Sequence, residues 1–433
     1  MIMRICRRLF GTSPPSGGGA RYRDGVTGSP TPWTVDQYRQ QLLTLAAGWP
    51  RVESCRLIEA TGRVLGQTVT ASRALPPFTN SAMDGFGIAA GPADACPAGY
   101  QVVAEIAAGQ MPSAGVLSRP IAPGQAVRIM TGAALPPGVD TVVPLEQAEV
   151  DGDLVRFVAP VTPGQHVRVA GEELPAGAVI LRPGTVLGPR QVAAAAATGA
   201  GSVQVARRPR VAVVTTGDEL VDPGALAGPV AVFDSNGPYL AAAMAAAGAT
   251  VVGLWRSRDD EAGLGAVLDQ AAAEADVVVA AGGVSAGDHD VSRAVLGPTG
   301  WFGPVAMQPG KPQGYGRWAG VPVVALPGNP VSVAVSSAVF VQPLLRAMTG
   351  ALTPPARSAV VRRGWTSPAG RRQYMPVTIH DNGSGQVEVS PASAGGAGSH
   401  LVASLAQADA LAVIPEKLTD VQPGLVVDLV DLY

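Results

Sequence analysis

Apolar positions recur at two spacings along the chain, and the spacing changes near residue 210. From about 69 to 159, short runs alternate apolar and polar residues and end at Pro- or Gly-containing turns, as at 126–130, 140–146 and 154–158. This pattern predicts short β-strands. From residue 210, near-continuous apolar runs alternate with segments of helical spacing, which is typical of a parallel sheet covered on both faces. Short strands return from residue 351.

The individual elements follow from the same patterns. In the α/β segment we predict strands at 210–214, 250–254, 276–280 and 321–326, and helices at 237–247, 261–273 and 330–347. Upstream, residues 33–47 have helical spacing with Thr34 as N-cap, and 189–198 form an Ala-rich helix. The predicted fold class is a multidomain α/β plus β protein.

Bulk composition excludes several functional classes. The 433 residues suggest two to four domains, and a net charge of −2 provides no field to attract nucleic acid or an anionic membrane. Cys6, Cys55 and Cys96 are too far apart for a metal knuckle, and they are expected to be thiols in a reducing cytoplasm. The four histidines have no ligand spacing, which argues against zinc hydrolase chemistry.

Neither of the two long uncharged stretches fits a membrane span. Residues 235–255 and 320–345 are broken by glycine or proline, so neither supplies about 20 uninterrupted apolar residues. The first 25 residues have only a very short apolar run, which does not fit a signal peptide. We therefore expect a cytoplasmic protein with no membrane segment and a disordered tail over residues 1–30.

Candidate chemistry gathers where the predicted strands of the α/β segment end. The loops 215–220, 281–290 and 326–332 follow such strands, and 308–312 lies between the last two. Ligands bind at the carboxyl edge of open parallel sheets. Glycines there allow close backbone approach, helix N-termini favour phosphate, and Lys311 adds a cation. The carboxylates of Glu219, Asp259 and Asp290 suit Mg²⁺, so this edge predicts a site for a phosphorylated ligand and a hard metal ion.

Each signal also has an ordinary structural interpretation. A glycine pair before a serine is commonly a simple turn, and Asp-Glu after a strand or Asp259-Asp260 before a helix is commonly a cap. Lys311, between two prolines, fits a solvated loop. The functional interpretation rests on the position of all these loops at one sheet edge.

Eight motifs in order resemble the molybdopterin molybdenumtransferases of the MoeA type, which are also similar to the C-terminal domain of gephyrin. The resemblance covers about Thr31 to Tyr433. The motifs are PPFTNSAMDGF (76–86), RIMTGA (128–133), VRxxGE (167–172), TGDEL (216–220), DSN (234–236), GGVSxGxxD (282–290), PGKP (309–312) and LPGNPVS (326–332).

The resemblance implies an elongated homodimer of four-domain subunits. The expected parts are a discontinuous elongated domain (31–68 and 162–206), an inserted β domain (69–161), a molybdopterin-binding three-layer α/β domain (207–350) and a C-terminal β-barrel (351–433). The implied Mg²⁺-dependent reaction takes adenylylated molybdopterin and molybdate, cleaves the phosphoanhydride, releases AMP and places molybdenum on the dithiolene sulfurs. Implied partners are a molybdopterin adenylyltransferase and molybdoenzyme maturation proteins.

The resemblance also implies roles for individual residues. Asp84 and Thr131 would lie over the other subunit's α/β domain, and Lys311, Ser332, Arg371 and Ser404 in the region that receives molybdate. The implied catalytic residues are Asp84, Thr131, Glu219, Asp259 and Asp290, of which Glu219, Asp259 and Asp290 would order the metal. The implied cofactor-binding residues are Gly217, Asp218, Ser235, Gly282, Gly283, Ser285, Lys311, Asn329, Ser332, Arg371 and Ser404.

The chain departs from the family pattern in three places. Pro304 and Gln308 stand where lysines are frequent, the GED triplet reads Gly-Glu-Glu at 171–173, and GRxEFxR reads GRRQYMP at 370–376. Two alternative functions are a molybdopterin adenylyltransferase, which shares the α/β domain, and a non-catalytic scaffold. The first has no need of Asp84, Thr131 or a barrel, and the second could lose the three carboxylates that are retained here.

Overall fold

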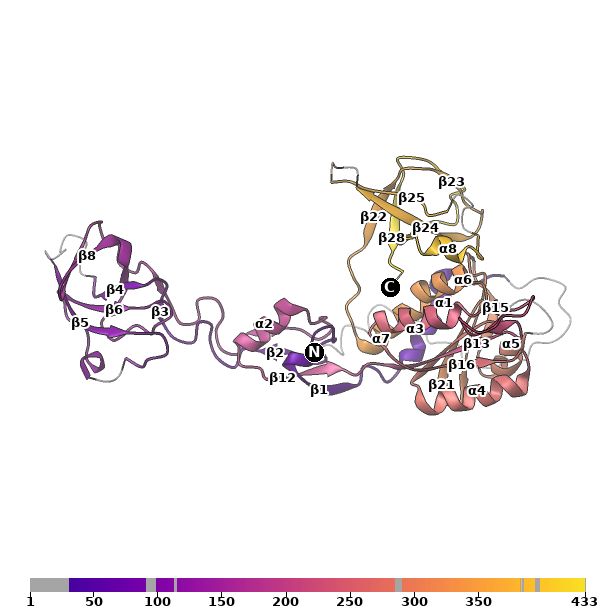
Figure 1. Ribbon diagram of the computed structural model, residues 1–433, viewed down its shortest axis with the longest axis horizontal. Helices are drawn as coiled ribbons and strands as arrows, with labels where there is room; N and C mark the ends of the chain where they lie inside the picture. The colour runs from indigo at the N-terminus through magenta and orange to yellow at the C-terminus, as the bar shows by residue number, and fades with distance from the viewer. Residues whose placement is uncertain are drawn as a thin grey trace, which may run out of the picture.

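The structure, a computed structural model, describes residues 31–90, 99–112, 115–284, 290–381, 383, 385–393 and 398–432. The molecule is elongated: a β domain lies at one end, and an α/β domain with a second β domain above it lies at the other (Figure 1). The 1–30 tail expected to be disordered lies outside the described residues.

The N-terminal helix packs into the α/β core. Helix α1 (Val35–Leu43), extended by a 3₁₀ turn η2 (Thr44–Ala46), begins at the predicted N-cap. Thr34 Oγ1 accepts from the Gln37 N–H while the Gln37 side chain accepts from the Thr34 N–H, a capping box. Tyr38 is fully buried in the α/β core and donates its hydroxyl to Gly314 O at 2.8 Å. This helix is therefore fixed relative to the sheet.

Two chain segments run out from the α/β domain and back through a thin middle region. Strand β1 (Val52–Arg56) pairs with β12 (Ser202–Ala206), β2 (Val69–Thr70) with β11 (Val179–Leu181), and β3 (Asn80–Ser81) with β10 (Val167–Arg168), all antiparallel. The 3₁₀ turn η3 (Leu57–Glu59) and α2 (Pro189–Ala197) cover β1 and β12 and bury a small apolar core. Each such pair is short, so the region resembles an arm.

The arm ends in the inserted β structure. Its sheet, in the described residues, has the order β7-β4-β6-β5-β9-β8. The strands are β4 (Gly85–Ile88), β5 (Tyr100–Ile106), β6 (Gln125–Ile129), β7 (Thr141–Pro144), β8 (Ala148–Asp151) and β9 (Leu154–Phe157), with 3₁₀ turns η4 (Gly115–Ser118) and η5 (Leu145–Gln147). Each of the three alternating runs contains a strand, as predicted.

The α/β domain has a sheet of order β16-β13-β17-β21-β20-β18 in the described chain. The predicted strands are confirmed as β13 (Arg210–Thr216), β16 (Thr250–Ser257), β17 (Val277–Ala281) and β21 (Val321–Leu326), all parallel. Helices α3 (Asn236–Ala246), α6 (Pro330–Ser336) and α7 (Gln342–Thr349) cover one face with α1, and α4 (Glu261–Glu274) and α5 (Val291–Leu296) cover the other. Short strands β14 (Leu220–Val221) and β15 (Val232–Phe233) form a separate pair.

Two antiparallel strands of the α/β sheet were not predicted from the sequence. Strand β18 (Trp301–Pro304), after the 3₁₀ turn η6 (Gly297–Thr299), pairs with β20 (Pro312–Trp318), and β20 pairs with β21. Glycines at 303, 314 and 316 break the apolar pattern there. Added Cβ atoms at Gly303 and Gly314 would lie 2.6 Å from Trp301 and 2.3 Å from Phe302, so the aromatic rings need this space.

The helix predicted at 330–347 is longer and contains a π-helical turn, η7 (Ser337–Val341), between α6 and α7. Among the described residues, only its span Pro330–Thr349 is long and apolar enough to cross a membrane. It is a core helix, because 83% of that window is buried inside the protein.

The C-terminal part closes into a barrel of five strands in the described residues, in the order β24-β25-β22-β28-β26 and back to β24. They are β22 (Arg357–Val361), β24 (Arg372–Asp381), β25 (Val387–Pro391), β26 (Ala410–Ile414) and β28 (Val426–Val430), with β23 (Trp365–Thr366), β27 (Asp420–Val421) and helix α8 (Val402–Leu405) outside the ring. Strand β19 (Met307–Gln308) pairs with β24, so a segment preceding β20 is tied to the barrel.

Candidate functional site

Three loops meet at the carboxyl edge of the parallel strands, as predicted. The register pairs Thr215 with Ala281 and Ala281 with Leu326, so the segments that follow β13, β17 and β21 emerge side by side. Gly282 has φ of +106°, and a Cβ there would lie 2.5 Å from Thr216 Oγ1. The backbone after β17 passes directly over the end of β13, so a residue larger than glycine does not fit at position 282.

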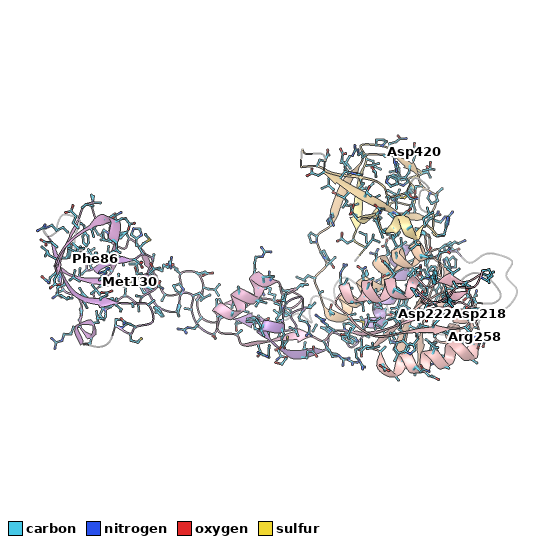
Figure 2. All side chains as sticks on the ribbon, in the orientation of Figure 1. Phe86, Met130, Asp218, Asp222, Arg258 and Asp420 are labelled. Carbon is cyan, nitrogen blue, oxygen red and sulfur yellow. The ribbon has the colours of Figure 1, made fainter. Side chains whose placement is uncertain are left out.

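Acidic side chains line this edge. The Asp218 N–H donates to Asp259 Oδ2 and the Asp259 N–H donates to Asp218 Oδ1, both at 3.4 Å. Asp260 caps α4 instead, accepting from the Gly263 N–H at 2.7 Å, which leaves Asp259 outside the helix. Figure 2 shows Asp218, Asp222 and Arg258 gathered at this edge. Glu219 follows a strand and caps no helix; its carboxylate lies over Gly217, 2.8 Å from the position of an added Cβ.

Asp290 differs from the other acids of the site. It stands at the N-cap position of α5 without a side-chain capping bond, and both of its carboxylate oxygens are buried without a hydrogen-bond partner among the described residues. Burial raises the pKa of Asp290 to about 6, while the nearby backbone N–H and the positive charge of Arg293 lower this pKa and the charge of Asp259 raises it. A buried carboxylate that faces another acid is stabilised by a cation.

The donor set fits Mg²⁺ in composition. Among the described residues no group of three His, Cys, Asp or Glu side chains is arranged to hold a metal, but Asp259 is near enough to Asp290 for its charge to raise the Asp290 pKa. Mg²⁺ commonly takes only one or two carboxylates and completes its shell with waters and substrate phosphates. The pair is thus suited to a Mg²⁺ ion that binds together with a phosphorylated ligand.

The predicted ligand residues on α3 and α6 stand around the same edge. Ser235 is half-buried at the N-cap of α3, and Asn236 Nδ2 donates to Gly328 O at 2.7 Å, which ties α3 to the β21 loop. Ser332 is 3% exposed in the first turn of α6. Gly283 has φ of +64° and adjoins Ser292. Ser285 lies outside the described residues.

The other predicted ligand residues lie at the seam between the α/β domain and the barrel. Arg371 Nη1 donates to Gln308 Oε1 at 2.9 Å, and Asn329 Nδ2 donates to Ser399 Oγ at 3.0 Å. Lys311 is exposed. Ser404 lines a small cavity with Val331 of α6. Residues far apart in sequence thus place cations and hydroxyls along one junction.

Gln313 is buried and anchors the Lys311 loop to α6. It was not among the residues predicted from the sequence. Its amide is 1% exposed, and Nε2 donates to Gly310 O at 2.8 Å and Ser336 Oγ at 2.7 Å. The only signal in the sequence was a polar residue within a strand pattern.

Asp84 and Thr131 are brought together, but not to this edge. Both the N–H (2.6 Å) and the hydroxyl (2.7 Å) of Thr131 donate to Asp84 Oδ1, and these hydrogen bonds lower the pKa of the exposed Asp84. Their neighbours Phe86 and Met130 lie at the opposite end of the molecule from Asp218 and Arg258 (Figure 2). Within one chain, therefore, this pair cannot join the acidic edge.

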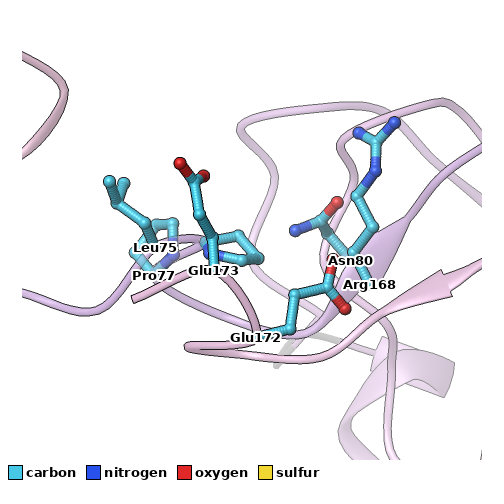
Figure 3. Close-up of a pocket in the computed structure, with 7 residues that line it drawn as sticks. Leu75, Pro77, Asn80, Arg168, Glu172 and Glu173 are labelled. Atoms are coloured by element: carbon cyan, nitrogen blue, oxygen red, sulfur yellow. The ribbon is translucent and has the colours of Figure 1, made fainter. Parts of the chain in front are cut away.

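A cavity of about 400 Å³, lined by both apolar and charged residues, lies where the arm meets the inserted β structure (Figure 3). It includes the Gly-Glu-Glu segment: the Val169 N–H donates to Glu172 Oε2 at 2.9 Å. Its lining is Leu75, Pro76, Pro77, Asn80, Arg168, Glu172 and Glu173. These residues were not among the predicted site residues, although several of them belong to the motifs at 76–86 and 167–172.

Three family models match successive parts of the chain: "MoeA N-terminal region (domain I and II)" at residues 33–199, "Probable molybdopterin binding domain" at 212–347, and "MoeA C-terminal region (domain IV)" at 358–432. Molybdopterin molybdenumtransferase 2 of Mycobacterium tuberculosis is 41% identical over 390 residues, covering 87% of this chain and 94% of that protein. Molybdopterin molybdenumtransferase of Haemophilus influenzae is 31% identical over 397 residues, covering 90% and 96%.

The fold is also similar to a solved structure. The crystal structure of the molybdopterin biosynthesis MoeA protein from Pyrococcus horikoshii superposes with a TM-score of 0.78 at 26% identity, over 93% of this chain and all of that one. The similarity extends over the arm, the inserted β structure, the α/β domain and the barrel.

Proposed function

The chain belongs to the molybdopterin molybdenumtransferase family, and on that premise we propose that it inserts molybdate into adenylylated molybdopterin with release of AMP. The observation that carries the chemistry is the unpartnered, buried carboxylate of Asp290 beside the glycine loop at 282–283. Its two oxygens have no hydrogen-bond partner among the described residues, which supports an external cation as their partner. A molybdopterin adenylyltransferase is not favoured, because relatives aligned across the arm and barrel are molybdenumtransferases.

We propose that Asp259 and Asp290 hold Mg²⁺ together with the phosphates of the nucleotide, and that Glu219, predicted as a third metal ligand but not grouped with them in the described residues, orders the attacking water. The bound ion would neutralise charge that develops as the phosphoanhydride is cleaved. Gly217, Gly282 and Gly283 allow close approach of the ligand, and Asp218 and Asp259 hold the loops after β13 and β16 together.

The seam supplies what molybdate, a divalent oxyanion, needs. Arg371 and Lys311 are exposed cations, and Ser332 and Ser404 are hydroxyl donors near the N-terminus of α6. Fixed donors of this kind stabilise an anion without reorganisation during the reaction. We propose that molybdate enters here, adjacent to the edge that holds the nucleotide.

We further propose a homodimer in which Asp84 and Thr131 of one subunit complete the edge of the other. The support is geometric: their motif carries an ordered, ionised carboxylate that lies at the far end of its own chain from the other predicted catalytic residues. A C₂ arrangement would place two such arms reciprocally. We also propose that the protein acts in the cytoplasm and that it contacts a molybdopterin adenylyltransferase and molybdoenzyme maturation partners.

The reaction is tested by giving purified protein adenylylated molybdopterin, Mg²⁺ and molybdate while AMP and active cofactor are measured. Wild-type protein should release AMP, and Asp290→Asn should lower turnover at least about 100-fold, the scale of a lost electrostatic group. Absence of AMP release by the wild type would refute the proposed function. Equal turnover by the variant would remove Asp290 from the mechanism.

The composite site is tested by mixing two inactive variants, Thr131→Val and Asp290→Asn. If subunits exchange at random, half of the dimers are mixed and each has one intact site, so about a quarter of wild-type turnover should return. No recovery after demonstrated exchange would contradict the shared site.

A further inference from the structure

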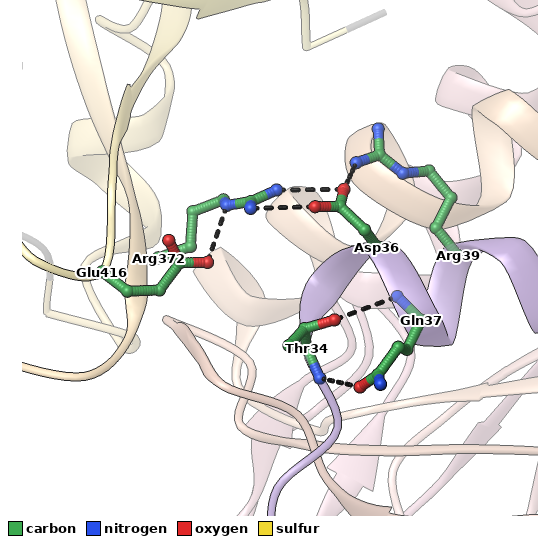
Figure 4. Close-up of polar contacts among 6 residues, drawn as sticks. All are labelled: Thr34, Asp36, Gln37, Arg39, Arg372 and Glu416. Atoms are coloured by element: carbon green, nitrogen blue, oxygen red, sulfur yellow. Dashed lines mark hydrogen bonds and ion pairs between the residues drawn. The ribbon is translucent and has the colours of Figure 1, made fainter.

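Arg372 joins the barrel to helix α1 through a network of charged groups (Figure 4). Its Nη1 and Nη2 donate to the two carboxylate oxygens of Asp36 at 3.1 and 2.9 Å, and its Nε donates to Glu416 at 3.0 Å. Arg39 donates to Asp36 as well, at 2.5 Å. The Arg372 side chain is only 20% exposed. The paired, parallel N–H bonds to Asp36 give this contact directionality as well as charge attraction.

Asp36 provides a rigid partner because its helix is part of the α/β core. Tyr38, two residues along, is fully buried and bonded to Gly314, and the capping box holds the first turn. On the barrel side, Arg372 begins β24, and the next residue, Gln373, pairs with Ile414 of β26; the Arg372 N–H donates across the seam to Ala306 O at 2.9 Å. The contact therefore links two rigid bodies.

The side chain of Arg371, the preceding residue, contacts the segment that precedes the Lys311 loop. Its Nη1 donates to Gln308 Oε1 at 2.9 Å, just before the loop that carries Lys311. A guanidinium has five N–H donors, so this bond leaves others free for an anion. Arg371 lies in the bend that immediately precedes β24, so the anchoring of Arg372 fixes the point of the backbone from which the Arg371 side chain extends.

We propose that Arg372 is a positioning residue: by holding the barrel against α1, it places the Arg371 guanidinium beside Lys311 to receive the oxyanion. This inference rests on the proposed function and identifies which residue sets its molybdate affinity. Gln308 orients the Arg371 guanidinium, because its amide oxygen accepts a hydrogen bond from Arg371. The Gln308 side chain is neutral, so it does not repel the positive charge of Arg371.

The inference predicts a selective kinetic effect. Arg372→Met should raise the KM for molybdate about tenfold, a change equivalent to about 1.4 kcal/mol, while kcat and the KM for adenylylated molybdopterin change less than about twofold. Arg372→Lys, which keeps the charge but loses the paired geometry, should recover only part of the affinity. The matched control is Arg357→Met, which breaks a 2.6 Å pair with Asp431 within the barrel and should leave all constants unchanged.

A double-variant cycle separates positioning from general damage. If Arg372 acts through Arg371, then Arg371→Met should raise the KM for molybdate and the further change Arg372→Met should add little. Full additivity of the two effects, or an equal loss in kcat and both KM values, would overturn the proposal.

Two readouts do not require turnover. Binding of molybdate alone, measured by equilibrium dialysis, should weaken in Arg372→Met, and amide hydrogen exchange at the start of β24, as at Gln373, should become faster. Unchanged exchange in that variant would overturn the anchoring role even if the enzyme is active. Wild-type protein that neither binds molybdate nor releases AMP would instead refute the proposed function, and with it the role of Arg371.

Discussion

Replacement of Asp290 by asparagine should make the α/β domain more stable at neutral pH while it abolishes turnover. The carboxylate is buried without partners and faces Asp259, so the folded protein holds its proton more tightly than the unfolded chain does. Asparagine is nearly isosteric and carries no charge. The usual cost of removing a polar group is therefore absent, and a destabilising ionisation is removed.

The size and sign of the effect follow from the pKa, which burial raises from 3.8 to about 6. Complete conversion of this difference would give about 3 kcal/mol. Asp290 is half-buried, so solvent screening reduces our expectation to about 1 kcal/mol. Between pH 4 and 6 the folded state binds more protons than the unfolded state, so stability falls as pH rises through this window. The advantage of Asp290→Asn should be near zero at about pH 4 and complete above about pH 7.

The assay is amide hydrogen exchange of β17 in the full chain, which reports opening of the α/β domain even though the protein has several domains. Wild type and Asp290→Asn are compared at pH 4.5 and 7.5 in EDTA, with Glu274→Gln, an exposed acid at the end of α4, as control. Mg²⁺ added at pH 7.5 should stabilise the wild type and have little effect on Asp290→Asn. An Asp290→Asn variant that is less stable than wild type at pH 7.5 would refute the reasoning.

Three further predictions concern other parts of the fold. Asp84→Asn should lower the unfolding free energy of the inserted β structure only slightly, as measured in its urea transition, because its hydrogen-bonded side chain is exposed. Asp276 has an 8% exposed side chain that accepts from Arg207 at 2.7 Å and pairs with Arg210 at 3.4 Å, so Asp276→Asn should cost about 2 kcal/mol in thermal unfolding. An unchanged melting temperature would show that these Asp276 ion pairs do not stabilise the fold. Gly282→Ala should cost about 2 kcal/mol or more, because the new Cβ would meet Thr216; a soluble variant of wild-type stability would show that the loop can move.

The local spacing of residues was sufficient to predict most elements of the α/β domain. Buried parallel strands need apolar side chains on both faces, so β13, β17 and β21 appear in the sequence as continuous runs of mostly apolar residues. Strands β18 and β20 were not predicted, since their glycines make room for neighbouring aromatic rings, and that requirement exists only after the chain has folded. The π-helical turn within residues 330–349 is equally invisible in the spacing.

By itself the sequence determined where the reactive residues would gather, because parallel strands present their carboxyl ends at one edge and the loops there contain Gly282, Asp259 and Asp290. Only the tertiary structure decided their state. Asp290 has unpartnered oxygens because the fold buries them, and Arg372 reaches Asp36 across 336 residues because α1 packs into the distant sheet. Charge and exposure are properties of surroundings assembled from the whole chain, so they cannot be derived from neighbours in sequence.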